Sequence, residues 1–275
     1  MKFHYCDKLI EDFLHAVEKP VVEKGARYYT GVDLGTACVV ICVLNEAGDP
    51  VAGAYQYADV VKDGMLVDYM GAVQIVRDLK RQLEAQLNTE LHTAAAAIPP
   101  GTDQLDSGAI RNVVESAGFE IDRILDEPTA ANEILQIKNG AIVDIGGGTT
   151  GISIIKDDKV VYVNDEATGG THFSLVVSGA YKLPYEEAEL YKRDRNNHKE
   201  LIGVLKPVIE KVASIISRHI AGHDVQEILL VGGTSCLNGI EDIIAEKTGV
   251  LTHKPQNPMF VTPLGIALSC KNHKI

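Results

Sequence analysis

The sequence predicts an α/β protein built from two related lobes. A strand that ends at Asp33 continues through Gly35 into the apolar run 38–44, and the chain then turns back into a further strand. The same succession of strand, Asp-x-Gly turn, strand, turn and strand recurs at Asp144 and Gly146. Stretches with apolar residues at helical spacing follow each unit. A repeated unit of this kind implies two lobes of related architecture.

The repeat also divides the chain into segments. We expect an N-terminal helical extension in residues 1–27, a first lobe in residues 28–139 and a second lobe in residues 140–275. Apolar residues at helical spacing between residues 7 and 19 predict a helix in the extension. This helix either docks on the body of the protein or recruits a partner, and docking is the commoner fate of such a stripe. Residues 94–98 can form a buried strand or the end of a helix.

Composition narrows the classes of partner. The chain has 275 residues, of which 45% are hydrophobic, enough for a substantial core. Its 26 basic and 38 acidic residues give a formal charge of -12, which argues against nucleic acid and anionic membranes as partners. A phosphate ligand must therefore be held by local amides, hydroxyls and a metal ion. Five cysteines without a C-x-x-C pair, and no leader-like or membrane-spanning run, favour the cytoplasm.

The two turns carry groups suited to a nucleotide. Glycine lets backbone amides approach phosphate oxygens closely, and Gly35 and residues 146–148 supply such positions. Asp33 and Asp144 end matching strands, where their carboxylates can anchor Mg²⁺. Three hydroxyls near the turns can reach phosphate oxygens or metal-bound water, those of Thr36, Thr149 and Thr150. A single Asp-x-Gly turn is also what an ordinary hairpin shows, so it is the pair that favours a nucleotide site.

Five motifs resemble the actin and Hsp70 superfamily. Residues 31–36 and 144–149 resemble its two phosphate loops, and residues 126–131 are similar to the connecting motif of Hsp70. Residues 231–235 resemble its adenosine motif, and residues 263–267 resemble its closing helix. The resemblance implies a two-lobed actin-like (ribonuclease H-like) ATPase fold. The peripheral subdomains are expected to be reduced, because the stretch before the adenosine motif is too short for the extra subdomain of Hsp70.

Within the superfamily the chain resembles the ethanolamine-utilisation J family, short Hsp70-like proteins of bacterial ethanolamine catabolism. The segments that carry this likeness are residues 58–61, 99–103, 126–130 and 165–170. The resemblance implies a chaperone-like role in reactivating ethanolamine ammonia-lyase or in assembling the bacterial microcompartment. It implies a location in the bacterial cytoplasm, with or without association with the microcompartment, and leaves self-association open.

The resemblance also implies cofactors and residue roles. The cofactors are ATP or ADP with Mg²⁺; Asp33 and Asp144 would hold the metal, and these two with Glu127 would be catalytic. An ordinary helix start at Pro128 would show the same residues around Glu127. The residues implied in nucleotide binding are Gly35, Thr36, Gly146, Gly147, Gly148, Thr149, Thr150, Gly169, Gly170, Gly232, Gly233 and Thr234.

Hydrolysis itself stays open at this point. In the superfamily an acidic residue follows the paired glycines after the second hairpin, whereas Thr171 and His172 follow Gly170 here. Slow ATP hydrolysis and binding without hydrolysis both agree with this departure. The alternative function is a non-hydrolysing actin-like scaffold or filament-forming protein. A small-molecule kinase of the hexokinase branch is disfavoured by the short chain and by the lack of an acceptor-binding insert.

Two other polar clusters have the pattern of ordinary surface. His219 and His223 lie four residues apart on a predicted helix, but no third ligand accompanies them, which favours a solvated helix end over a metal site. Residues 192–195 mix positive and negative charge. That pattern predicts a second exposed helix end.

Overall fold

The computed structural model divides the chain into two compact units. It describes residues 3–23, 25–62, 65–99 and 104–272, without the side chains of residues 104–107. Unit 1 comprises residues 1–136 and 260–275, and unit 2 comprises residues 137–259. Residues 100–103, part of one segment that carries the family resemblance, lie outside the described residues.

The division differs from the one that the sequence predicts. The N-terminal helix is an integral part of unit 1, and the final helix α9 (Val261–Asn272) also belongs to unit 1 instead of the second lobe. The physical reason lies in packing, because α9 is buried along its length and lies against α4 (Glu127–Leu135) and β1 (Tyr29–Leu34).

Each unit contains a five-stranded sheet, and the two sheets have the same topology. The order in unit 1 is β3 (Pro50–Tyr57), β2 (Cys38–Leu44), β1, β6 (Thr93–Ile98) and β7 (Glu120–Asp126). The order in unit 2 is β10 (Lys159–Glu166), β9 (Thr150–Lys156), β8 (Gly140–Ile145), β11 (Glu227–Val231) and β12 (Leu251–His253). In both, the first three strands are antiparallel neighbours and the remaining pairs are parallel. The predicted repeat is confirmed, and residues 94–98 form a strand.

The two hairpins of the repeat also match in register. Leu34 pairs with Val39 across the first turn, and Ile145 pairs with Thr150 across the second. The turns therefore comprise residues 35–38 and 146–149, and Asp33 corresponds to Asp144. Thr36 corresponds to Gly147, and Thr149 corresponds to Cys38, so the two threonines occupy different positions in their turns.

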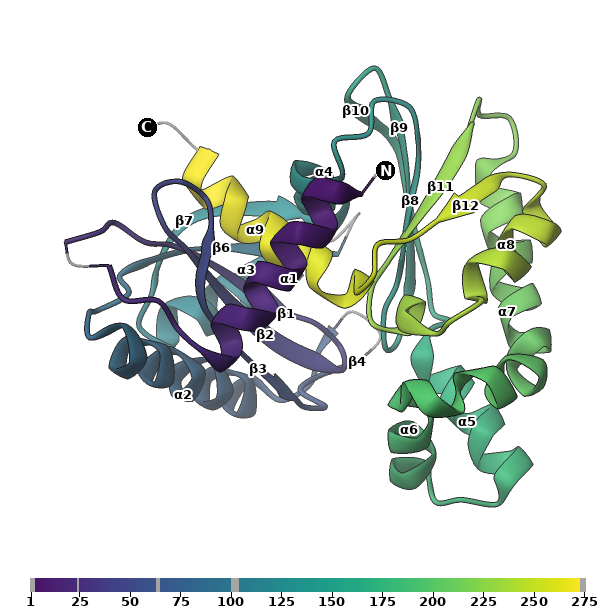
Figure 1. Ribbon diagram of the computed structural model, residues 1–275, viewed down its shortest axis with the longest axis horizontal. Coiled ribbons are helices and arrows are strands. Elements are labelled where there is room, and N and C mark those ends of the chain that lie inside the picture. Colours follow the sequence, from purple (N-terminus) through teal and green to yellow (C-terminus); the bar gives the residue numbers. More distant parts are fainter. Residues whose placement is uncertain (1–2, 24, 63–64, 100–103, 273–275) are drawn as a thin grey trace. The chain divides into compact units, whose positions relative to one another are not determined.

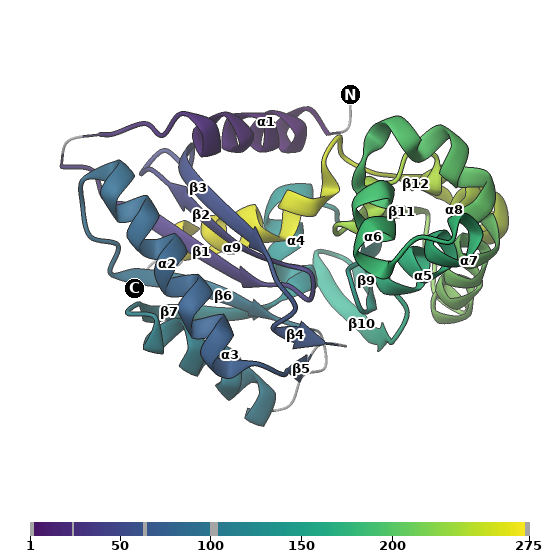
Figure 2. The same ribbon diagram turned by 90° about the horizontal axis from the view of Figure 1, so that it is seen from below.

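Helices cover both faces of the sheet in unit 1, as Figure 2 shows for α1 (His4–Glu18) and α2 (Tyr69–Leu87). Ala94 and Ala96 of β6 pack in the core formed with α2 and α3 (Gln104–Ser116). Ala95 and Ala97 face the other way and pack with α4 and α9. This alternation is that of a strand buried on both faces. A short hairpin, β4 (Val61–Lys62) and β5 (Met65–Leu66), precedes α2.

The N-terminal helix docks on unit 1. Phe13 of α1 is fully buried, and its ring lies 5.2 Å from that of Phe260, centroid to centroid. A Cβ added to Gly53 of β3 would lie 2.2 Å from the Phe13 ring, so a glycine there lets the ring approach the strand. The apolar stripe of α1 is thus used within the protein, which is the commoner of the two fates expected for it.

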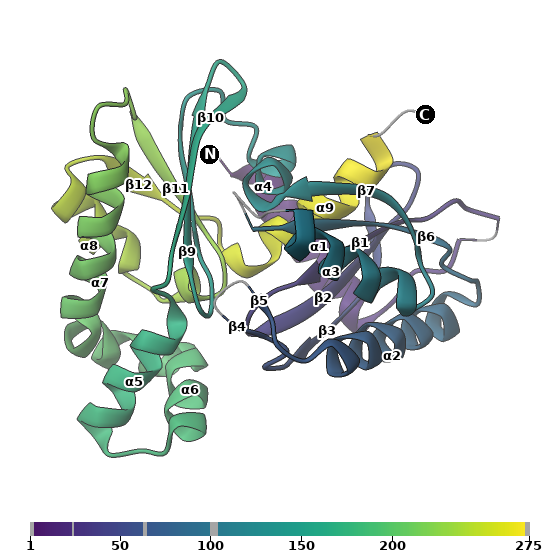
Figure 3. The ribbon, with the colours of Figure 1, turned by 180° about the vertical axis from the view of Figure 1, so that it is seen from behind.

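In unit 2 the longest helices lie along one face of the sheet (Figures 1 and 3). The helices are α5 (Gly170–Tyr181), α6 (Tyr185–Arg193), α7 (His198–Ile220) and α8 (Ile240–Thr248), with 3₁₀ turns η1 (Arg195–Asn197), η2 (Thr234–Cys236) and η3 (Pro258–Phe260). Apolar residues of α7 such as Leu205 and Ile209 share a core with Val143, Ile152 and Leu230 of the sheet. This packing leaves α5 and α6 as a pair beside the ends of the strands.

We expect Gly265→Ala to destabilise unit 1. An added Cβ would lie 1.8 Å from the carbonyl oxygen of Ala130, so α4 and α9 must move apart, at a cost of about 1–3 kcal/mol in free energy of unfolding. Urea unfolding followed by circular dichroism measures the change. Gly108→Ala in α3 is the control, because no described atom lies within 4 Å of its added Cβ. Wild-type stability of Gly265→Ala would contradict the close packing of α4 on α9.

Candidate functional site

The turn formed by residues 146–149 presents backbone amides. The Gly146 N–H donates to the carbonyl oxygen of Thr149 (N···O 3.0 Å), which closes the turn. Among the residues that the structure describes, no protein acceptor receives the N–H groups of Gly147, Gly148 or Thr149. Three successive amides of this kind place partial positive charge where an anion such as phosphate can bind.

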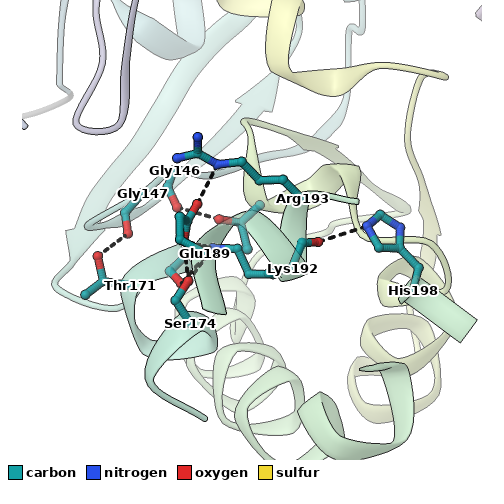
Figure 4. Close-up of polar contacts among 10 residues, drawn as sticks. Gly146, Gly147, Thr171, Ser174, Glu189, Lys192, Arg193 and His198 are labelled. Atoms are coloured by element: carbon teal, nitrogen blue, oxygen red, sulfur yellow. Dashed lines mark hydrogen bonds and ion pairs between the residues drawn. The ribbon is translucent and has the colours of Figure 1, made fainter. Parts of the chain in front are cut away.

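The carbonyl oxygens of the same turn are bonded to two other elements. That of Gly146 accepts hydrogen bonds from the Gly170 N–H (2.9 Å) and from the Thr234 hydroxyl (2.8 Å). That of Gly147 accepts from the N–H (2.8 Å) and the hydroxyl (3.0 Å) of Thr171 (Figure 4). The start of α5 and the start of η2 therefore hold the turn by its carbonyls, and its amides stay available to a ligand.

Two glycines allow α5 to come this close. A Cβ on Gly169 would lie 2.7 Å from the carbonyl carbon of Gly148 and 2.8 Å from the nitrogen of Thr149. A Cβ on Gly170 would lie 2.5 Å from Thr234 Oγ1. Both positions therefore exclude any side chain, and the backbone of the turn meets the backbone of α5 directly.

Asp144 lies beside the glycines that follow the next strand. β8 and β11 run parallel with Asp144 paired to Val231, so both strands end at the same edge. Gly232 has a φ of +89°, and a Cβ there would lie 2.2 Å from Asp144 Oδ1. Unit 2 therefore brings together Asp144, residues 146–149, Gly169, Gly170 and residues 232–234. They lie at the carboxyl-terminal edge of its sheet, where open α/β sheets bind ligands.

The predicted threonines fall into two groups. Thr150 is fully buried, and its hydroxyl donates to the Thr168 carbonyl at 2.5 Å, so it holds the loop before α5 instead of facing a phosphate. The hydroxyl of Thr234 is likewise bonded within the fold, to Gly146. In contrast, the hydroxyls of Thr36 and Thr149 form no hydrogen bond with the described residues. Only these latter two are available to a ligand.

In unit 1 the first turn and Glu127 lie at one edge of the sheet. β1, β6 and β7 are parallel neighbours, so Asp33 and Glu127 are two strands apart, roughly 10 Å in the plane of the sheet. Gly35 is required in its turn, because a Cβ there would lie 2.9 Å from the Cys38 carbonyl oxygen. This arrangement matches the place that the sequence predicts for Asp33, and the role of each residue stays a prediction.

The segment before α4 is a helix start. The carboxylate of Asp126 accepts from the N–H (2.9 Å) and the hydroxyl (2.8 Å) of Thr129, and Pro128 occupies the first turn. Asp126 is therefore the N-cap, as expected of an ordinary helix start. Glu127 is the first helical residue, and the cap alone accounts for its position. This observation does not test whether Glu127 takes part in catalysis.

The expectation of exposed helix ends is wrong for two residues. The side chain of Lys192 is 10% exposed, and its Nζ lies 2.7 Å from Glu189 Oε2. The side chain of His219 is also 10% exposed, with Nε2 2.7 Å from Glu166 Oε1 and Nδ1 2.6 Å from the Tyr162 hydroxyl. The spacing of Glu189 and Lys192 on one helix face is a signal that could have revealed the first pair. The partners of His219 lie in β10, too distant in sequence for a local signal.

Metal ligands are not clustered in the part of the chain that the structure describes. No group of three or more His, Cys, Asp or Glu side chains there could hold a metal ion. Asp33 and Asp144, the predicted anchors of Mg²⁺, lie in different units, and each makes further contacts with the protein. Among the described helices, none combines the length and the apolar character required to cross a bilayer.

His198 joins α6 to the segment before α8. It is buried, and its Nδ1 accepts the N–H of Asn238 (3.1 Å), so its Nε2 carries the proton and donates to the Lys192 carbonyl (3.1 Å). Burial is the main cause that lowers the pKa of His198 below its ordinary value. The neutral ring satisfies both contacts, whereas a proton on Nδ1 would face another donor.

Comparison with known sequences finds close relatives of the chain. Ethanolamine utilization protein EutJ of Salmonella typhimurium is 47% identical over 242 residues, which cover 88% of this chain and 85% of that protein. A chaperone protein HscA homolog of Chromobacterium violaceum is 25% identical over 70% of this chain and 39% of its own length. The family model described as type IV pilus assembly protein PilM matches residues 120–260.

Comparison with solved structures also finds relatives of the chain. The crystal structure of ethanolamine utilization protein EutJ from Carboxydothermus hydrogenoformans is 46% identical, with a TM-score of 0.90 over 95% of this chain and 97% of that one. MreB5 of Spiroplasma citri bound to ADP is 18% identical, with a TM-score of 0.69 over 90% and 98% of the two chains. The predicted actin-like α/β fold is confirmed by these likenesses.

We expect unit 2 to lose stability as the pH falls below about 6.5, the ordinary pKa of histidine. Because the pKa of His198 is depressed in the folded protein, the unfolded chain binds a proton first, so the stabilisation is present above that pH and is lost as the pH falls. Thermal unfolding at pH 7.5 and 5.5 measures the loss, which His198→Gln should reduce. His92→Gln, at an exposed position, is the control. An unchanged loss in His198→Gln would contradict the assignment.

Proposed function

Because this chain belongs to the family of EutJ ethanolamine utilization proteins, we propose that it is a nucleotide-binding, Hsp70-like accessory protein of ethanolamine utilisation. The same fold occurs in the HscA and MreB relatives, one of which is a chaperone homolog and the other a protein bound to ADP. The ligand proposed for this chain is ATP or ADP with Mg²⁺.

The turn of unit 2 is the observation that carries the proposal. Its three amides that find no acceptor among the described residues, those of Gly147, Gly148 and Thr149, are suited to phosphate oxygens, and the start of α5 contacts the carbonyls of the same turn. A glycine-rich turn with such amides is a common backbone site for phosphate, whereas the first amides of α5 are bonded to carbonyl oxygens of the protein. This support is independent of the family likeness, because it rests on hydrogen bonds that the turn makes and leaves unmade.

Residue roles follow from this assignment. Asp33 and Asp144 are each proposed as anchors of Mg²⁺, which would supply charge neutralisation to the phosphates when bound. Gly35 and Thr36 belong to the corresponding turn of unit 1 and are proposed to contact phosphate. Residues 232–234 are proposed to contact the nucleoside. Glu127 is proposed to order water.

A second candidate function is a scaffold that binds nucleotide without hydrolysing it. The hydroxyl of Thr171 stands where the superfamily has a carboxylate, and it is bonded to the Gly147 carbonyl, so this position supplies no base. His172 follows with an Nδ1 that is buried and without a hydrogen-bond partner among the described residues. We therefore expect turnover, where it occurs, to be well below the ~10 s⁻¹ typical of enzymes.

The proposed clients are ethanolamine ammonia-lyase and proteins of the bacterial microcompartment. The likeness to a chaperone homolog supports a chaperone-like action, although the chain spans only 39% of that relative's length. The proposed place of action is the bacterial cytoplasm, at or near the microcompartment. Self-association is part of the scaffold alternative.

Calorimetric titration with Mg-ATP and Mg-ADP tests the proposal. Wild type should bind, and Asp144→Ala should weaken binding about ten-fold or more, because it removes a carboxylate proposed to hold the metal. Gly169→Ala should do the same, because its methyl group must displace the backbone of Gly148 or Thr149. Gly179→Ala, in the same helix with no described atom within 4 Å of its added Cβ, should bind like wild type. No binding by wild type at millimolar nucleotide would remove the proposal.

Sedimentation velocity separates the accessory protein from the scaffold. We expect a small species whose size does not depend on nucleotide over a wide range of protein concentration. The Asp144→Ala variant serves as the control for effects that do not need the metal-binding carboxylate. Large species that form only with Mg-ATP, and not in the variant, would favour the scaffold or filament instead.

A further inference from the structure

The ammonium group of Lys192 lies against the start of α5. Its Nζ donates to the carbonyl oxygen of Gly170 (3.0 Å), to Ser174 Oγ (2.8 Å) and to Glu189 Oε2 (2.7 Å). Figure 4 shows Lys192 beside Ser174 and Glu189. All three donor positions of the ammonium are therefore used inside the protein. A charged side chain so deeply placed is costly unless it is fully bonded, and this one is.

Glu189 compensates the charge. Its carboxylate accepts from Lys192, from the hydroxyl of Ser174 and from Arg193 Nε (2.7 Å). Burial alone would raise the pKa of Glu189, but the charge of Lys192 and the hydrogen bonds outweigh it, so the pKa lies below its ordinary value. The pair is thus ionised at neutral pH.

Gly170 connects this pair to the turn of residues 146–149. Its N–H donates to the Gly146 carbonyl, while its own carbonyl accepts from Lys192. A Cβ on Gly170 would lie 3.1 Å from Lys192 Nζ and 2.5 Å from Thr234 Oγ1. The absence of a side chain at one residue therefore lets the ammonium, a hydroxyl and the turn converge on it.

Lys192 is a second donor to the Gly170 carbonyl, whose other acceptor position takes the N–H of Ser174 within the α5 helix. The Ser174 hydroxyl also lies within reach, at 3.1 Å, but it has a single proton, and the Glu189 carboxylate, as a charged acceptor, takes that proton. Without Lys192 this carbonyl would keep its helical hydrogen bond, but the start of α5 would lose the charged donor that links it to α6.

We propose that Lys192 is a positioning residue that holds the start of α5 against the amide-presenting turn. The consequence for ligand affinity rests on the proposed function, whereas the consequence for the turn itself does not. Lys192 acts through Gly170, and Glu189 keeps the ammonium in place. A merely stabilising ion pair predicts something different, since replacing both partners of a buried pair by neutral residues is often neutral or stabilising.

Hydrogen exchange in the ligand-free protein tests this proposal. The variants are Lys192→Met, the double variant Lys192→Met/Glu189→Gln, and the control Lys199→Met at an exposed position. Exchange at the hydrogen-bonded amides of Gly146, Gly170 and Thr171 should rise about ten-fold or more in the first two, since a charged hydrogen bond is lost, and should stay at the wild-type rate in the control. Strand β11 reports on the rest of unit 2 and should be unchanged in all variants.

The double variant decides between positioning and simple stabilisation. It leaves neither charge of the Lys192–Glu189 pair unpaired, and Arg193, which also loses its carboxylate partner, is 31% exposed and can be hydrated. Its unfolding temperature should therefore return toward that of wild type while the faster exchange persists. Wild-type exchange in Lys192→Met, or exchange that recovers together with stability in the double variant, would overturn the proposal.

Nucleotide affinity supplies a separate readout. Lys192→Met and the double variant should both bind Mg-ADP about ten-fold more weakly than wild type, and Lys199→Met should bind equally well. Failure of wild type to bind Mg-ADP would count against the proposed function alone, because the exchange rates still decide whether Lys192 positions the turn. If wild type binds Mg-ADP and the double variant binds it equally well, the proposed effect of Lys192 on ligand affinity is overturned.

Discussion

The carbonyl oxygen of Gly146 is the contact on which the site of unit 2 depends. A carbonyl has two acceptor positions, and here an amide of α5 and a hydroxyl of η2 occupy both. The peptide cannot rotate without losing two hydrogen bonds at once. Its fixed orientation in turn sets the direction of the following amides, so glycine at positions 169, 170 and 232 is a condition for the whole arrangement.

The two units show how one topology supports unlike turns. Both sheets have the same strand order, and both hairpins have the same register, yet residues 36–38 are Thr-Ala-Cys where residues 147–149 are Gly-Gly-Thr. In unit 2 the third strand leads directly into α5, which supports the turn from behind. In unit 1 the third strand leads into the β4–β5 hairpin. The support of the turn by a following helix is therefore a property of unit 2 and is not inherited from the repeat alone.

Local patterns predicted the fold well because each is determined within a few neighbouring residues. Alternation, helical spacing and the Asp-x-Gly turns predicted the two-lobed α/β repeat, and glycine chemistry located the turn, whereas the actin-like class came from the resemblance of five motifs to the superfamily. What escaped prediction depends on distant packing. Lys192 has the pattern of a solvated residue until α5 and α6 are placed together, Thr150 until the loop at Thr168 is known, and His219 until Glu166 is found beside it. Local patterns could not assign α9 to unit 1, because the chain returns to unit 1 only after it has passed through the whole of unit 2.

That return has a consequence for how the protein is made. On the ribosome, residues 1–136 emerge first, but the helix that covers Ala95 and Ala97 of β6 and Ala130 of α4 is α9, which comes more than a hundred residues later. Domains generally close as they leave the exit tunnel. Unit 2, which is contiguous, can therefore close before unit 1. The nascent chain carries an uncovered apolar layer until residues 261–272 emerge, and that interval is when it is most exposed to aggregation and to capture by cellular chaperones.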